Sequence, residues 1–478
     1  MAAPLAWPGV RSGEAPAPVA KQVEAYLRSE MQERRIPGLQ VAVVRHGKIA
    51  LLGAYGLANL QHQVPVTDHT VFSINSATKS FTGVAMMQLA EEGKVDLDAP
   101  VSRYLEGLPA PWQPVTLRQL LIHVSGIPNI VNQRSGKLGT EGGDDAAWAH
   151  IQTVPMDFPT GERYSYNQTN YLLLGKVIDK VSGMPFVRFI TEGQFQVVGM
   201  PGSGFGDSRD VIPLKADPYR YSREGHLSPV YEEFPAFLRT GAGLNTTAKE
   251  VAHWIMALQQ RKLLKRESSL SALWTPGKFN NGTSAPDALG WPAIRQSPHR
   301  AVAGIGGARS AFYVYPDDDL AVVILTNLRG ADPEKMIDTV AGFYLPTLRE
   351  VNGSGFAVYE LRTELLKRGF EHAAEVFRLA RQKHPAFQPS ENDLIAWGYR
   401  LLEQHHPEKA IPIFKLGTDL YPRSSNAYDS LAEAYEAAAD RASALSNYRR
   451  SLELDSKNDH AVARIKALQS ATGGPQSK

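Results

Sequence analysis

Strand-forming segments stand at both ends of the first 345 residues, with a long helical stretch between them. Segment 39–53 is rich in β-branched and apolar residues and is broken by His46-Gly47, which predicts two strands joined by a turn. The signal returns at 310–315 and 320–326, on either side of an acidic turn. One antiparallel sheet built from both chain ends, with helices on its faces, is therefore predicted, which is an α+β fold.

Helical patterns fill the intervals between these strands. Apolar residues recur at spacings of three and four in 19–35, and segment 80–92 is apolar on all sides before it ends at a glycine. The second of these helices is expected to be buried on most sides. Further helices are predicted at 171–181 and after a capping box formed by Thr247 and Glu250.

The composition changes at residues 353–355, and helical sequence with an internal repeat follows. Small and aromatic residues recur at a spacing of 34, as in Gly398 and Ala432, Leu401 and Tyr435, Ala410 and Ala444, and Phe414 and Tyr448. This period is similar to the tetratricopeptide repeat, which implies an all-α domain that can bind a protein or peptide segment. A helical region that only packs on the rest of the chain is the alternative.

The expected organisation has five parts. They are a flexible leader at 1–19, the α+β domain at 20–345, a linker at 346–355, the repeat-containing helical domain at 356–470 and a tail at 471–478.

Composition narrows the functional classes. The 478 residues include 51 Lys and Arg and 49 Asp and Glu, and this net charge of +2 argues against nucleic-acid binding. Disulfides and Cys-ligated metals are excluded because the chain has no cysteine. No membrane span, metal or cofactor is predicted. The N-terminus does not resemble a signal peptide, so the chain as written is expected in the cytoplasm, or in the periplasm or outside the cell if the N-terminus has been trimmed.

Ser76 and Lys79 are three residues apart where the chain enters the apolar helix, so they share one helix face. Free backbone N–H groups at a helix start stabilise developing negative charge. Lysine can act as a base only if its pKa falls from about 10.4 toward neutrality. Burial beside Phe81, Val84 and Met87 would provide that shift. Ser76 is the predicted nucleophile and Lys79 its base.

Segment 72–83, which contains both residues, resembles the active-site segment of the penicillin-recognising serine hydrolases. That family includes class C β-lactamases, D-alanyl-D-amino-acid peptidases and lactamase-fold esterases. Segments 36–44, 117–128 and 241–248 are similar to further family segments, in family order. The resemblance covers roughly 20–345, and it implies a serine β-lactamase-like fold and hydrolysis through an acyl-enzyme.

The resemblance also implies a role for a second motif. Tyr166 matches the family tyrosine and is expected to relay protons; a buried aromatic with a satisfied hydroxyl is the alternative. Gln168 stands where the family often has Asn, and its amide could hold Lys79 or a substrate carbonyl. His123, in a third family segment, is expected to make a structural hydrogen bond.

The third family motif, Lys-Thr-Gly or His-x-Gly, is altered. Gly304 stands where the family has its cation. The N–H of Gly307 can still form an oxyanion hole with the N–H of Ser76, and Gly306 is expected to line the substrate site. Losing the cation disfavours β-lactamase or carboxypeptidase activity and favours hydrolysis of esters or neutral amides. Arg309 is the candidate replacement cation, and a surface ion pair is its alternative role.

The resemblance therefore implies a serine hydrolase that acts on an ester, amide or lactam in a small molecule or peptide. Loops at 128–155 and 200–235 are expected to shape its pocket. The alternative is a lactamase-like domain with decayed chemistry that recruits a partner through the helical repeat.

Overall fold

The computed structural model describes residues 11–12, 17–131, 142–222 and 225–470. Most of the predicted leader and all of the predicted tail lie outside the described residues, as do parts of the pocket loops predicted at 128–155 and 200–235. Among the described helices, none combines the length and apolar character needed to cross a bilayer.

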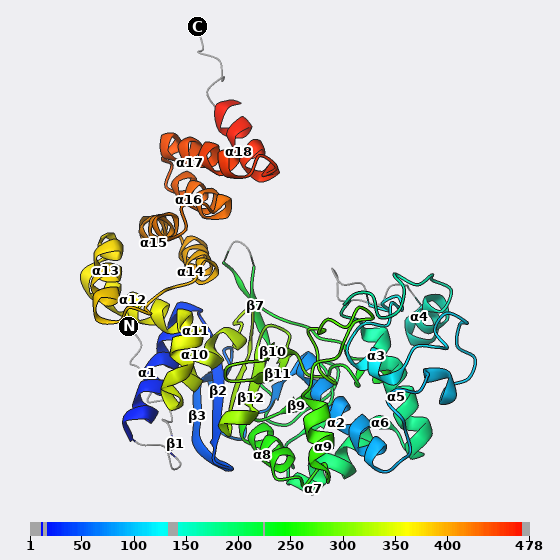
Figure 1. Ribbon diagram of the computed structural model, residues 1–478. Coiled ribbons are helices and arrows are strands. Elements are labelled where there is room, and N and C mark those ends of the chain that lie inside the picture. Colours follow the sequence, from blue (N-terminus) through cyan, green and yellow to red (C-terminus); the bar gives the residue numbers. More distant parts are fainter. Residues whose placement is uncertain (1–10, 13–16, 132–141, 223–224, 471–478) are drawn as a thin grey trace. The chain divides into compact units, whose positions relative to one another are not determined.

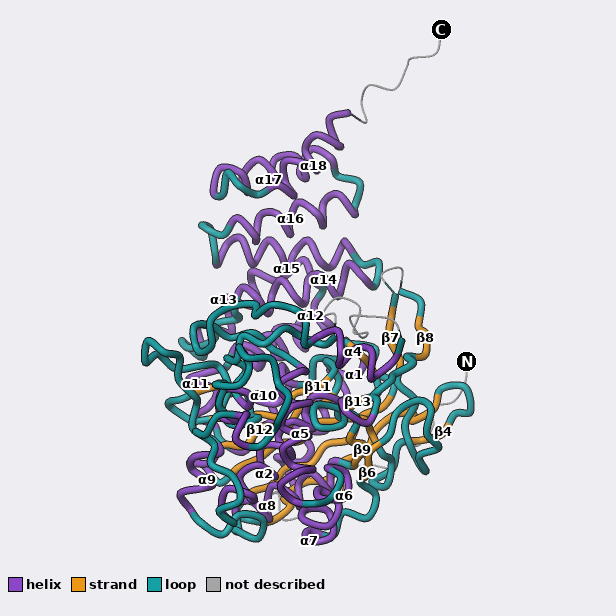
Figure 2. The backbone as a smooth tube through the Cα atoms, turned by 90° about the vertical axis from the view of Figure 1, so that its right-hand side faces the viewer, coloured by secondary structure: helices purple, strands orange, loops and turns teal. Residues whose placement is uncertain are grey.

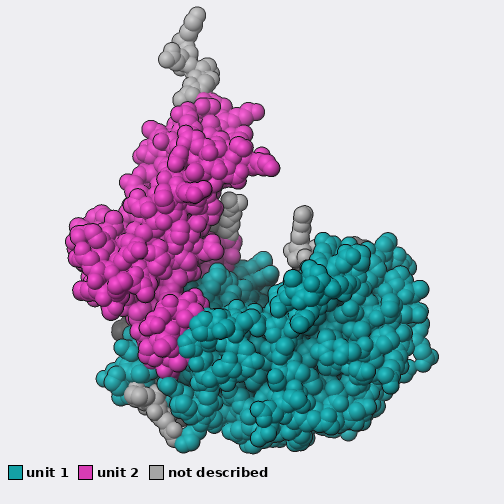
Figure 3. All heavy atoms as spheres, viewed as in Figure 1, with its two compact units in different colours: residues 1–220, 228–341 teal, residues 221–227, 342–478 magenta. Residues whose placement is uncertain are grey.

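The chain divides into two compact units (Figure 3). The first comprises Met1–Arg220 and Ser228–Ala341, and the second comprises Tyr221–Leu227 and Gly342–Lys478.

The first unit is built on one antiparallel sheet (Figure 1). Its strands are β1 (Arg11–Ser12), β2 (Gly38–Arg45), β3 (Lys48–Asn59), β4 (Val64–Pro65), β10 (Ala293–Arg295), β11 (Ala301–Gly306), β12 (Ser310–Tyr315) and β13 (Leu320–Thr326). They lie in the order β1-β3-β2-β13-β12-β11-β10, and β4 pairs with β3. Central strands β2 and β13 come from opposite ends of the unit, with Val41 opposite Ile324. The sheet predicted from both chain ends is confirmed.

The local sequence explains these strands. All seven residues of β13 are buried, as its continuous apolar run requires in a strand covered on both faces. The β2–β3 turn places His46 and Gly47 at φ of 52° and 68°, the left-handed conformation that tight hairpin turns need. The sequence predicted both features.

Helices and short strands complete the first unit. The helices are α1 (Ala17–Glu33), α2 (Thr78–Glu91), α3 (Leu117–Leu121), α4 (Gly143–Ile151), α5 (Gln168–Ser182), α6 (Phe186–Ile190), α7 (Gln196–Val198), α8 (Ala248–Gln259), α9 (Glu267–Leu273) and α10 (Glu334–Tyr344). The short strands are β5 (Phe72–Ser73), β6 (Gly204–Phe205), β7 (Tyr219–Tyr221), β8 (Leu227–Pro229), β9 (Leu244–Thr246) and β14 (Leu328–Arg329). Strands β7 and β8 and helix α10 each include residues assigned to the second unit. Helix α8 packs on β2, β3 and β13, and α2 packs on β11.

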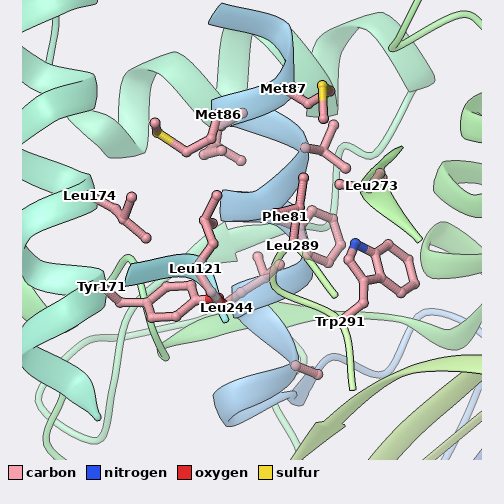
Figure 4. Close-up of a cluster of buried hydrophobic side chains, with 14 of the residues drawn as sticks. Phe81, Met86, Met87, Leu121, Tyr171, Leu174, Leu244, Leu273, Leu289 and Trp291 are labelled. Atoms are coloured by element: carbon pink, nitrogen blue, oxygen red, sulfur yellow. The ribbon is translucent and has the colours of Figure 1, made fainter. Parts of the chain in front are cut away.

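Helix α2 runs through the core of this unit (Figure 4). Phe81 stacks on Trp254 with ring centroids 3.8 Å apart, and Trp254 stacks on Trp291. Buried residues occur around the whole circumference of α2, as predicted. Replacing Phe81 with Ala would cost about 3–5 kcal/mol, because a buried aromatic leaves a cavity.

The predicted capping box at α8 is half formed. Thr247 accepts a hydrogen bond from the Glu250 N–H at 3.1 Å. The Glu250 carboxylate instead accepts bonds from the Gly202 N–H and the Ser203 hydroxyl. The reciprocal half of the prediction is wrong because a long-range loop occupies this carboxylate.

The second unit is helical, as predicted, and most of its successive helices stack on one another (Figure 2). They are α11 (Pro346–Asn352), α12 (Ser354–Arg368), α13 (Ala373–Lys383), α14 (Glu391–Glu403), α15 (Pro407–Leu420), α16 (Ser425–Ala437), α17 (Arg441–Leu454) and α18 (Asp459–Ser470). Residues 346–355, predicted as a linker, are largely helical, since Pro346 is well suited to the first helical position.

The 34-residue spacing is visible in the helix starts, since α16 starts at Ser425 and α14 at Glu391. A Cβ at Gly398, on α14, would lie 2.4 Å from the ring of Phe414 on α15. A small residue is therefore needed where these two helices pack together. The tetratricopeptide identity and a protein partner stay predictions.

Candidate active site

Ser76 lies at the start of α2. It belongs to the one-turn helix η1 (Asn75–Ala77), which follows β5 and leads directly into α2. Asn75 has a φ of +47°, in the left-handed region that Asn tolerates better than most residues. Its carbonyl accepts a hydrogen bond from the Thr78 hydroxyl. Ser76 is therefore presented on a sharp turn before a rigid, buried helix.

Lys79 is buried one turn along α2. Its Nζ donates to the Gly241 carbonyl at 2.9 Å and to Gln168 Oε1 at 3.0 Å. The same nitrogen lies 4.6 Å from the Tyr166 ring centroid and 5.0 Å from that of Tyr171. Burial lowers the pKa of Lys79 to about 7, although the charge of Asp287 opposes the shift. A large fraction of Lys79 is thus neutral near pH 7 and able to accept a proton.

Tyr166 lies just before α5, against the same lysine. Burial raises the pKa of Tyr166 to about 12, while hydrogen bonds with Ser76 and Gln168 act in the opposite direction. The hydroxyl is therefore protonated at neutral pH, which favours Lys79 rather than Tyr166 as the initial base. The structure brings Ser76, Lys79, Tyr166 and Gln168 together.

Asp287 is a site residue that sequence reasoning missed. Its carboxylate accepts a hydrogen bond from the Tyr164 hydroxyl at 3.2 Å, and the residue is 6% exposed. Burial raises the pKa of Asp287 to about 6, opposed by the Tyr164 hydrogen bond and the Lys79 charge. Nearby Gly290 fits tightly against α2, since a Cβ there would lie 2.6 Å from the Lys79 carbonyl. A lone aspartate in a loop offers no sequence motif that could have identified it.

His123 has the structural hydrogen bond expected of it. Its Nδ1 accepts from the Asn167 N–H at 3.1 Å, and its ring lies 4.6 Å from the Tyr166 ring. Burial, together with the charge of Lys79, lowers the pKa of His123 well below its usual value. A neutral His123 therefore supports the turn that carries Tyr166.

Gly304 and Gly306, both on β11, differ in what surrounds them. A Cβ at Gly306 would lie 1.9 Å from the Ile74 carbonyl oxygen and 2.8 Å from the Ser76 nitrogen. At Gly304 a Cβ would lie 2.1 Å from the ring of Phe312, its cross-strand neighbour. Phe312 is buried against Trp254 and Trp291. At Gly304, the position that the resemblance aligns with the family cation, any side chain would therefore meet this core aromatic ring.

Arg309 is buried rather than on the surface. It is 2% exposed, and its Nη2 donates to Asn75 Oδ1 at 2.7 Å and to Glu232 Oε2. The alternative prediction, an ion pair at the surface, is wrong in location. Arg309 does form an ion pair, with Glu232, but the pair is buried. Gly307, with a φ of +61°, forms the turn beside Asn75. Roles for Gly306, Gly307 and Arg309 in binding substrate stay predictions.

A possible metal-ligand group lies in the second unit. Among the described residues, one oxygen or nitrogen from each of Asp429, Glu433 and His460 lies within 4.8 Å of the others. His460 Nδ1 is 2.9 Å from Asp429 Oδ2, and Nε2 is 3.6 Å from Glu433 Oε1. The His460 ring therefore lies within reach of both carboxylates.

Comparisons with known proteins agree with this geometry. A family model described as Beta-lactamase matches residues 23–343. Protein flp of Staphylococcus aureus (strain MW2) is 25% identical over 328 residues, which are 66% of this chain and 65% of that protein. The chain thus spans slightly less than two thirds of that relative's length. Teichoic acid D-alanine hydrolase of Staphylococcus aureus (strain MRSA252) is 28% identical over 66% of this chain and 75% of its own length.

A solved structure shows the same fold. The octameric penicillin-binding protein homologue from Pyrococcus abyssi has a TM-score of 0.61 and 24% identity, over 72% of this chain and 81% of that chain. Since the family model covers most of the chain, this protein belongs to the Beta-lactamase family, and its relatives include hydrolases of that fold.

Proposed function

We propose that this protein is a serine hydrolase that works through an acyl-enzyme, with Ser76 as nucleophile and Lys79 as base. The observation that carries the proposal is the buried Lys79 amine, held by Gln168 and the Gly241 carbonyl, with its pKa lowered to about 7. A serine hydroxyl is a weak nucleophile unless a neighbouring base accepts its proton. Lys79 meets that need without a histidine.

The proposed reaction has two stages. Ser76 Oγ attacks the substrate carbonyl carbon as its proton passes to Lys79 Nζ. The N–H groups of Ser76 and Gly307 stabilise the oxyanion. The bond to the leaving group then breaks, and the proton reaches that group through the Tyr166 hydroxyl. Water attacks the acyl carbon in the second stage, and Ser76 recovers a proton as the acid is released.

The substrate we favour is an ester or a neutral amide. Gly304 packs against the buried ring of Phe312 where the resemblance predicts the family cation for a substrate carboxylate, and Arg309 is engaged by Glu232 and Asn75. A substrate that depends on such a carboxylate would lack its partner here. The name of the teichoic acid D-alanine hydrolase supports an acyl substrate of this kind, such as a D-alanyl ester.

Covalent labelling tests the chemistry. The full chain is treated with a fluorophosphonate, and mass spectrometry locates the added mass. We expect the label on the peptide that contains Ser76 and none on Ser76→Ala, which should also lose turnover of a nitrophenyl ester. A label on another residue, or unchanged turnover by Ser76→Ala, would refute the assignment.

The second candidate is a binding protein with decayed chemistry. Gly304 at the position aligned with the family cation favours it, because a fold does not by itself fix a function. This candidate predicts a folded protein that takes no label at Ser76. The same experiment therefore separates the two.

A further inference from the structure

Three polar side chains form a closed network beside Ser76. Glu232 Oε1 accepts from Asn75 Nδ2 at 2.9 Å, and Glu232 Oε2 accepts from Arg309 Nη2. Arg309 Nη2 also donates to Asn75 Oδ1 at 2.7 Å, which closes the triangle. Residues 75, 232 and 309 are far apart in sequence, so the network exists only in the folded unit.

The network joins the two segments that carry the proposed oxyanion hole. Asn75 directly precedes Ser76, whose N–H is one donor. Arg309 follows Gly307, whose N–H is the other donor, by two residues. These segments also meet where the Ser310 hydroxyl donates to the Ile74 carbonyl at 2.8 Å. Glu232 belongs to neither segment and holds both.

Glu232 is itself held in place. Its N–H donates to the Ser208 hydroxyl at 2.9 Å, and its carbonyl accepts from the Ser208 N–H at 3.0 Å. The side chains of Arg309 and Glu232 are only 2% and 9% exposed. Removing two charges from water is costly, and an apolar pair of similar volume would often be as stable. Stability alone therefore does not explain why charges stand here.

We propose that Glu232 is a positioning residue, which sets the spacing of the Ser76 and Gly307 N–H donors through Asn75 and Arg309. The inference rests on the proposed function, because it needs Ser76 to form a tetrahedral oxyanion. Such donors must stand about 2.7–3.1 Å from the oxyanion, not from the ground-state carbonyl oxygen. A misplacement of about 1 Å can cost about 100-fold in rate.

The first test is Glu232→Gln, which keeps the size and an acceptor for Asn75 but removes the charge that faces Arg309. We expect kcat for a nitrophenyl ester to fall about 10- to 100-fold, with KM within about threefold, because the donors matter in the transition state. The kcat for the matching thiono ester should fall much less. Its sulfur is a weak hydrogen-bond acceptor, so turnover of this ester depends little on the N–H donors.

Two double variants separate positioning from folding. Glu232→Met with Arg309→Met removes both members of the buried ion pair at once, so it should fold as the wild type does and be as slow as Glu232→Gln. Glu30→Met with Arg34→Met removes another buried ion pair, on and just after α1, with side chains 5% and 9% exposed. This matched control can change the melting temperature, but kcat should stay at the wild-type value.

The possible results distinguish failure of the role of Glu232 from failure of the proposed function. A kcat within about threefold of wild type in both Glu232 variants would overturn the inference, as would equal losses on the oxygen and thiono esters. If the wild type takes no fluorophosphonate at Ser76, the proposed function itself fails. If wild type and Glu232 variants are labelled at equal rates, only the role of Glu232 fails.

Discussion

The helix side and the strand side of the candidate site present different chemistry. On the helix side, η1, α2 and the start of α5 direct the polar groups of Lys79, Tyr166 and Gln168 toward one another and toward Ser76. On the strand side, β11 and β12 offer glycine backbone and the ring of Phe312. The groups proposed to move protons lie on the helix side, and the position aligned with the family cation, on the strand side, is Gly304. Catalysis and recognition are therefore separable here, and each can be tested alone.

The largest expected effect lies on the helix side. Lys79→Met keeps the length and the apolar contacts of the side chain but removes the base. We expect kcat/KM for a nitrophenyl ester to fall by about 10⁴-fold or more, as when other activating bases are removed. The matched control is Lys180→Met. Lys180 lies on α5, is exposed and pairs with Glu106, so this variant should keep full activity. A loss below tenfold in Lys79→Met would place the base elsewhere.

Tyr166→Phe should have the next largest effect. It removes the hydroxyl that is proposed to pass the proton to the leaving group, and general acid–base groups contribute about 10²- to 10⁴-fold. Steady-state kinetics on esters with good and poor leaving groups measures this, and the poor leaving group should suffer more. Tyr315→Phe removes another buried hydroxyl, bonded to Asp338, and should affect stability but not kcat. Equal losses on both esters would argue against the relay.

On the strand side, Gly306→Ala and Gly304→Ala add the same methyl group two residues apart. At Gly306 it meets backbone beside Ser76, so we expect kcat to fall about 100-fold as one oxyanion donor is displaced. At Gly304 it meets the Phe312 ring, so the expected cost is about 1–3 kcal/mol of stability with kcat near wild type. Thermal unfolding and ester kinetics on both variants measure this contrast between a loss of kcat at Gly306 and a loss of stability at Gly304. Similar effects of the two variants on kcat would contradict it.

The smallest expected effect is a shift in pH dependence. Lys79 has a pKa of about 7, so kcat/KM should decline as the pH falls through 7 and the amine becomes protonated. The Asp287 charge favours protonated Lys79, so Asp287→Asn should lower that pKa and move the acid limb of the profile to lower pH. A pH–rate profile measures the shift. An upward shift, or none, would mean that Asp287 does not act on Lys79.

Local sequence predicted the parts of the fold that depend on neighbouring residues. Strands β2, β3, β12 and β13 and the burial of α2 follow from apolar runs and turn residues. Resemblance to a family located Ser76, Lys79 and Tyr166 before their contacts were known. In each case the signal lies within a few residues of the feature.

Contacts between distant residues could not be predicted in this way. Glu232 bonds to Asn75 across 157 positions of sequence. Asp287 interacts electrostatically with Lys79 from a loop that carries no recognisable motif. The ring of Phe312 fills the space above Gly304 because the two are cross-strand partners, a fact of register that composition does not encode. The burial of Arg309 could not be predicted for the same reason, since its acceptors Asn75 and Glu232 are remote in sequence.

The pairing of β2 with β13 has a consequence for synthesis of the protein. These neighbours are among the first and last strands made, with Gln40 opposite Leu325. A nascent chain that has not yet released β13 from the ribosome carries Ser76 and Lys79 but lacks the sheet that aligns them. Contacts so distant in sequence form slowly and leave strand edges exposed meanwhile. The proposed hydrolase activity should therefore be silent during most of translation, and arrested chains that end before Leu320 should depend on chaperones to remain soluble.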